Sequence, residues 1–93
     1  KMTLAEKLGQ LQQLDGDYPT GKGRPEHFEM ARKGLLGSTL NVRGAAESNE
    51  LQKAALESRL KIPILFAFDV IHGYRTVFPV PLGESASWDL AAM

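Results

Sequence analysis

Residues 64–69 read Ile-Leu-Phe-Ala-Phe-Asp, and this stretch decides how the rest of the chain is interpreted. Five consecutive apolar residues without polar alternation are typical of a strand covered on both faces, as the strands of parallel sheets are. The run ends at Asp69, and a loop that contains His72, Gly73 and Arg75 follows it. Because α/β proteins place functional side chains at the carboxyl ends of parallel strands, we expect Asp69 to lie at a binding site.

The sequence on either side of this strand predicts alternating helices and strands. Thr3 and Glu6 stand at capping-box spacing and open a helix, which we expect to continue to Leu14 before an Asp-Gly-Asp turn. Asn41 lies at the end of a short predicted strand, is polar and could face a site. The expected order is helix (3–14), loop (15–24), helix (25–33), strand (36–42), helix (47–59), strand (64–68), loop (69–84) and helix (85–90).

Strands that alternate with helices place the chain in the α/β class. Two predicted strands would leave open sheet edges and uncovered apolar faces. An eight-stranded α/β barrel needs about 250 residues, whereas this chain has 93 and begins without an initiator Met. We therefore expect a fragment of a larger domain, which is marginally stable or prone to aggregate when it is isolated.

The composition excludes several classes of function. Eleven acidic residues balance eleven Lys and Arg, so net charge gives no reason to expect nucleic acid or an anionic membrane as a partner. No apolar stretch approaches the roughly 18 residues of a membrane span. The chain contains no Cys, which excludes disulfides and thiolate chemistry and leaves the compartment open.

The loop after the apolar strand holds the residues best suited to chemistry. The Asp69 carboxylate could accept two sugar hydroxyls, or it could cap a turn or pair with Arg75; its position supports both roles equally. His72 could contact a ligand or shape the loop, and Arg75 could hold a neighbouring carboxylate by a bidentate contact. His72 has no second ligand at metal spacing, because His27 is remote, so we expect no metal or cofactor.

Other candidates fit structural roles better. Asp15 and Asp17 fall in a turn after a surface helix, and we do not expect them to form the pair of carboxylates that glycoside hydrolysis needs. Trp88 is expected to be a core aromatic on the last helix, with a sugar-stacking surface as the alternative. The apolar residues 78–82 are expected to pack the loop against the rim of the domain.

Four segments resemble family 3 glycoside hydrolases, and most closely the bacterial β-glucosidases of the periplasmic type. The strongest match is Phe-Asp-Val-Ile-His-Gly-Tyr-Arg-Thr-Val-Phe-Pro-Val-Pro-Leu-Gly at residues 68–83, preceded by Ser-Arg-Leu-Lys-Ile-Pro at 58–63. Residues 2–11 are similar to the family's N-terminal helix, and residues 37–42 to its first barrel strand.

The resemblance implies that residues 1–93 are the N-terminal portion of a (β/α)8, TIM-like barrel, incomplete in this chain, from an exo-acting retaining β-glucosidase. Asp69 matches the Asp that holds hydroxyls of the nonreducing sugar, with His72 and Arg75 as possible supporting residues. The catalytic nucleophile and acid/base would lie outside the segment. The implied partners are β-glucosides or oligosaccharides, the rest of the barrel and a second domain, and the implied location is periplasmic or extracellular.

Two other interpretations remain open at this stage. A noncatalytic sugar-binding module could keep the fold without the catalytic carboxylates, and a truncated structural fragment could have no activity at all. Within the family, Asp-x-Glu-Gly-Gly-Arg is typical of β-N-acetylglucosaminidases at the place where this chain has Asp-Val-Ile-His-Gly-Tyr-Arg. That departure favours a glucosidase, and it leaves β-xylosidase specificity possible.

Overall fold

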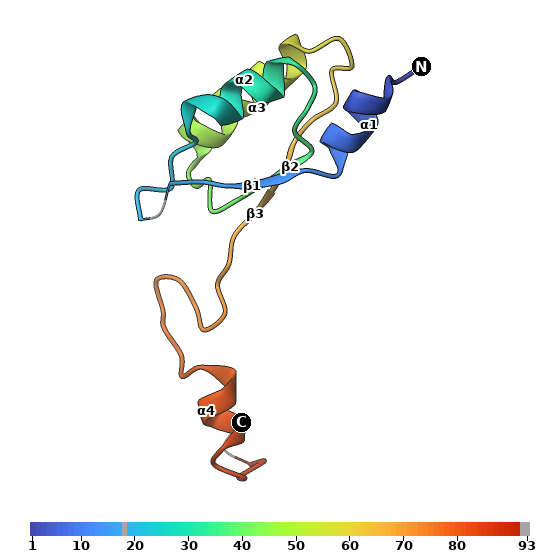
Figure 1. Cartoon of the computed structure of the whole chain (residues 1–93). Helices are drawn as coiled ribbons and strands as arrows, with labels where there is room; N and C mark the ends of the chain where they lie inside the picture. Colours follow the sequence, from blue (N-terminus) through green and yellow to red (C-terminus); the bar gives the residue numbers. More distant parts are fainter. Residues whose placement is uncertain (18, 92–93) are drawn as a thin grey trace.

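The computed structural model describes residues 1–17 and 19–91. Its three strands form one parallel sheet in the order β1-β2-β3, with helices between them (Figure 1). The elements are α1 (Leu4–Gln10), β1 (Gln13–Asp15), α2 (Pro25–Arg32), β2 (Ser38–Leu40), α3 (Ala45–Glu57), β3 (Leu65–Ala67) and α4 (Pro81–Ser85). The predicted α/β class with a parallel strand at the apolar run is confirmed.

Helices α2 and α3 lie together over one face of the sheet (Figure 1). Leu51 on α3 is fully buried between these layers, with no exposed surface. Its neighbours Ala54 and Ala55 on α3 are small, which lets the helix pack closely, whereas Leu56 on the same helix is 45% exposed. The buried apolar residues are Ala31, Leu36, Val42, Leu51, Ala54, Ala55 and Ile64.

Strand β1 lies where the sequence predicted the end of the first helix, so that prediction was wrong. Helix α1 ends at Gln10, and the carbonyl of Gln12 accepts hydrogen bonds from the backbone N–H groups of Gly37 (3.2 Å) and Ser38 (3.1 Å). A longer helix would gain little burial from the leucines of this segment, since Leu11 is 82% exposed. Pairing with β2 satisfies the backbone groups of this segment and overrides the local helical pattern.

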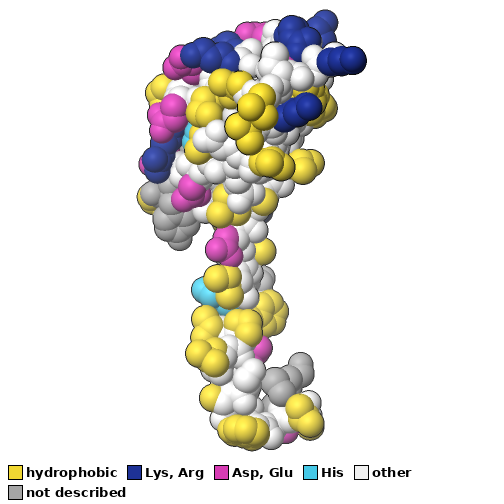
Figure 2. Space-filling view, turned by 45° about the vertical axis from the view of Figure 1, so that its right-hand side comes forward, with side chains coloured by type: hydrophobic (Ala, Val, Ile, Leu, Met, Phe, Trp, Pro, Cys, Tyr) yellow, Lys and Arg dark blue, Asp and Glu magenta, His cyan; other side chains and the backbone are white. Residues whose placement is uncertain are grey.

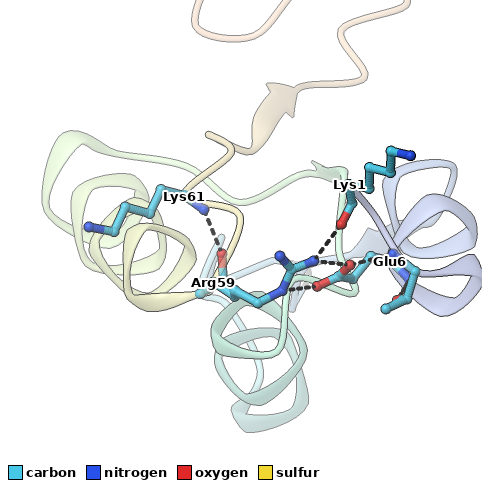
Figure 3. Close-up of polar contacts among 6 residues, drawn as sticks. Lys1, Glu6, Arg59 and Lys61 are labelled. Carbon is cyan, nitrogen blue, oxygen red and sulfur yellow. Dashed lines mark hydrogen bonds and ion pairs between the residues drawn. The ribbon is translucent and has the colours of Figure 1, made fainter.

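Helix α1 is attached to the layer by an ion pair and a close backbone approach. The Arg59 guanidinium donates to both carboxylate oxygens of Glu6, at 3.1 Å from Nε and 2.6 Å from Nη2, and also to the carbonyl of Lys1 (Figure 3). Thr3 and Glu6 form the predicted capping box. Gly9 faces the backbone of Leu35 so closely that any side chain there would collide with it.

The described chain beyond β3 extends away from the layer and contains the short helix α4 (Figure 1). Hydrophobic side chains lie exposed along this projecting segment (Figure 2), including Phe78 (62% exposed) and Leu82 (82%). They do not pack the loop against the domain as expected. Trp88 is 91% exposed and lies after α4, so the predicted core position on a helix over 85–90 was also wrong. In the described part of the chain, no helix combines the length and apolarity that a bilayer crossing requires.

Candidate functional site

Three polar residues meet at the carboxyl edge of the sheet, one from the end of each strand. Asp15 is the last residue of β1, Asn41 follows β2, and Asp69 lies two residues beyond β3. Parallel register places Asp15, Leu40 and Ala67 side by side, which brings the residues that follow into reach of one another. The strand pattern therefore predicted correctly the edge on which Asp69 lies.

Asn41 connects the other two residues of this edge, through the side chain of Asp15 and the backbone of Asp69. Its Nδ2 donates to Oδ1 of Asp15 at 2.8 Å, and its Oδ1 accepts from the backbone N–H of Asp69 at 3.4 Å. The sequence indicated that Asn41 could face the site. Asp15 was placed in a turn instead, because the three-residue strand Gln13–Asp15 is too short to show a pattern.

An open cavity of about 480 Å³ lies against this edge. This volume falls within the roughly 300–1,000 Å³ of small-molecule sites. Asp69 and His72 both line the cavity, whereas Arg75 lines a neighbouring one of about 360 Å³. The residues around the first cavity are Asn41, Arg43, Phe68, Asp69, Ile71, His72, Gly73, Tyr74 and Val77.

Arg43 brings a positive charge to the cavity, and no local pattern in the sequence indicated that it would lie there. Its guanidinium carbon lies 5.1 Å from the centre of the Phe68 ring and 5.7 Å from that of Tyr74. The two rings meet edge to face, 4.9 Å apart. The Arg43 guanidinium also donates to the carbonyl of Pro19. Arg43 therefore joins the loop after β3, by cation–π attraction, to the loop after β1, by a hydrogen bond.

The remaining sequence candidates have distinct surroundings. Arg75 lies 6.0 Å above the Tyr74 ring and, among the described residues, forms no ion pair with Asp69. The structural alternative for Asp69, pairing with Arg75, is therefore absent from this structure. The backbone carbonyl of His72 accepts a hydrogen bond from the N–H of Phe78 at 2.6 Å, which shapes the loop. His72 also lines the cavity.

The described residues contain no group of three or more His, Asp or Glu side chains that could hold a metal ion. A carboxylate, an amide, an imidazole and a guanidinium beside aromatic rings remain as the functional groups of the cavity. These groups suit a neutral, hydroxyl-rich ligand, since carboxylates accept hydrogen bonds from hydroxyls and ring faces contact the apolar parts of a sugar.

No protein-family model matches the chain. The chain is, however, 40% identical to the periplasmic beta-glucosidase of Salmonella typhimurium, in an alignment of 96 positions that includes all of this chain. The alignment spans only 12% of the length of that relative. This similarity over the full chain confirms the resemblance to a β-glucosidase of the periplasmic type that its sequence indicates.

Proposed function

We propose that the chain forms the N-terminal part of the (β/α)8 barrel domain of a family 3 glycoside hydrolase, an exo-acting retaining β-glucosidase. Two findings support the proposal: the 40% identity to a periplasmic beta-glucosidase, and a parallel sheet whose carboxyl edge carries Asp69. Because the chain spans 12% of that relative, the other barrel strands and any second domain belong to polypeptide outside this segment.

Asp69 binds the nonreducing glucosyl residue in this proposal. Its ionised carboxylate has two oxygens and can accept a hydroxyl proton at each. Each charge-assisted bond contributes roughly 1.5–3 kcal/mol. Such contacts hold the pyranose for attack, and they promote catalysis where they tighten in the oxocarbenium-like transition state.

His72 and Arg75 play supporting roles. His72 lies on the cavity wall, where its ring can reach a ligand. Arg75 packs over Tyr74, another lining residue, so its influence on the ligand is indirect. Retaining hydrolysis also needs two carboxyl groups about 5–5.5 Å apart, and we assign both to polypeptide outside this segment. The proposed location is periplasmic or extracellular, and the name of the relative supports the first of these.

The observation that carries the proposal is a carboxylate at the carboxyl edge of a parallel sheet, on the wall of a cavity of ligand size. The test replaces Asp69 by Asn in the complete protein that contains this segment. With an aryl β-glucoside as substrate, we expect kcat/KM to fall by at least about 100-fold, since two charge-assisted bonds are weakened.

Glu57→Gln is the matched control. It makes the same carboxylate-to-amide change in an exposed ion pair with Arg32, so we expect less than about a threefold effect. An Asp69→Asn variant that retains wild-type kinetics would contradict the assignment. Saturable glucose binding without turnover by the complete protein would favour a noncatalytic sugar-binding module. Faster hydrolysis of the aryl β-xyloside would indicate xylosidase specificity.

A further inference from the structure

We propose that Asn41 is a positioning residue for Asp69, and that Asp15 sets the orientation of the Asn41 amide. The consequence for catalysis rests on the proposed function, whereas the arrangement itself rests on hydrogen bonds among the three strand ends. Asn41 lies half-buried at the end of β2, between two exposed carboxylates, and its side chain bonds to both neighbouring strand ends.

The backbone of Asn41 is held in a conformation that few residues adopt. Its φ of 61° lies in the left-handed region, which Asn and Asp tolerate better than most side chains do. In this conformation its N–H still donates to the carbonyl of Ala67 at 2.9 Å. The main chain is therefore anchored to β3, and the position of its side chain relative to Asp69 is constrained.

The donors and acceptors around the Asn41 amide permit only one orientation. A carboxylate such as that of Asp15 accepts hydrogen bonds, while the backbone N–H of Asp69 donates one. The Asn41 NH2 group must therefore face Asp15 and its oxygen must face Asp69, as the distances of 2.8 and 3.4 Å show. The negative charge of Asp15 strengthens the shorter bond and excludes the flipped amide.

This contact lies where the loop leaves the sheet. Asp69 follows directly after Phe68, and from Val70 onward the loop bonds to itself, for example from the N–H of Gly73 to the carbonyl of Val70 at 3.0 Å. The direction in which the Asp69 carboxylate enters the cavity consequently depends on how its own N–H is held. Loss of the Asn41 acceptor should let Asp69 reorient without disturbing the core.

The test exchanges the two side chains in the complete protein. Asn41→Asp places a carboxylate against Asp15, and we expect kcat/KM for an aryl β-glucoside to fall about tenfold through repulsion and misplacement of Asp69. The double variant Asp15→Asn, Asn41→Asp restores a donor on one side and keeps an acceptor for the Asp69 N–H. We expect it to recover to within about threefold of wild type.

Further variants separate orientation from general damage. Asn49→Asp makes the same change on the exposed face of α3 and should have no measurable effect. Asn41→Gly keeps the left-handed backbone but removes the side chain, so it should resemble Asn41→Asp. In an Asp69→Asn background, Asn41→Gly should add little further loss, because both changes then act through one group.

Hydrogen exchange at the Asp69 amide keeps this inference distinguishable from the proposed function. We expect the Asp69 amide hydrogen to exchange faster in Asn41→Gly than in wild type. In the double variant Asp15→Asn, Asn41→Asp, we expect its exchange rate to return towards that of wild type. The positioning role would be overturned by two results together: a double variant as impaired in kcat/KM as Asn41→Asp alone, and a hydrogen-exchange rate of the Asp69 amide that is the same in all variants as in wild type. Wild-type activity in Asp69→Asn, with the exchange pattern as expected, would instead overturn only the proposed function.

Discussion

The part of the chain beyond β3 is richer in apolar residues than the part before it, yet its apolar side chains are far less buried. In the part up to β3, Leu51 of α3 is fully buried in the core between the helices and the sheet. Beyond β3, Leu82 is 82% and Trp88 91% exposed on a segment that extends away from the layer (Figure 1). The difference teaches that an apolar pattern shows which residues favour burial, while burial itself requires a second surface to pack against.

The sheet itself shows the same asymmetry. Ile64 is 4% exposed, whereas Leu65 in β3 is 74% exposed, although both belong to one apolar run. A strand of a parallel sheet is normally covered on both faces. In the proposed barrel, the uncovered face and the projecting segment would both pack against polypeptide outside these residues.

The largest expected contrast is between Leu51→Ala and Leu82→Ala in the 93-residue chain. Leu51→Ala leaves a cavity in the only core cluster of the described residues and should cost about 2–5 kcal/mol, comparable to the stability of so small a core. Leu82→Ala should change the free energy of unfolding by less than about 0.5 kcal/mol. Urea titration followed by far-ultraviolet circular dichroism measures both, and equal effects would contradict the comparison.

A smaller effect is expected when acid protonates Glu6. Hydrogen bonds from Arg59, and then from the backbone and hydroxyl of Thr3, lower the pKa of Glu6 from 4.5 to about 2. Its stabilising contribution is therefore complete above pH 4.5 and is lost as the pH falls towards 2.

Thermal unfolding of wild type and Glu6→Gln measures this contribution. We expect wild type to have the higher midpoint near neutral pH, and the difference to shrink as the pH approaches about 2. Glu29→Gln, in an exposed pair with Lys33, is the control and should show a smaller difference at neutral pH. A difference for Glu6→Gln that is independent of pH would mean that the ion pair with Arg59 does not attach α1.

The smallest effect on stability is expected from deletion of residues 70–93. The described side chains of this segment bury little area, so the free energy of unfolding should change by less than about 0.5 kcal/mol. Binding of a hydrophobic dye and self-association should both decrease, because the exposed apolar surface is removed. Unfolding of the shortened chain would show instead that the projecting segment supports the layer.

Local signals predicted much of the fold correctly. The capping box at Thr3 and Glu6 is present, and the helices predicted over 25–33 and 47–59 are found at Pro25–Arg32 and Ala45–Glu57. Each depends on neighbours within a few positions in the chain. Strand β1 was missed, since its only cause is pairing with a strand more than twenty residues away.

The candidate site divides in the same way. Asp69 was identified because an apolar run leading to a carboxylate is visible in the sequence, and a parallel sheet directs such a residue to one edge. Its contact with Asn41 joins residues 28 positions apart, and the contact of Asn41 with Asp15 joins residues 26 positions apart. Arg43 was missed for the same reason, because its aromatic partners belong to the loop after β3.

The sequence by itself determined the class of fold, the start of α1, the positions of α2 and α3 to within two residues, and the carboxylate beyond the end of β3. These features follow from periodicity, capping and punctuation by Gly and Pro, which act over a few residues. Only the tertiary structure decided that Asp15, Asn41 and Asp69 meet at one edge and which apolar residues are buried. Both outcomes require distant segments to pack side by side, and no local pattern encodes which segments those will be.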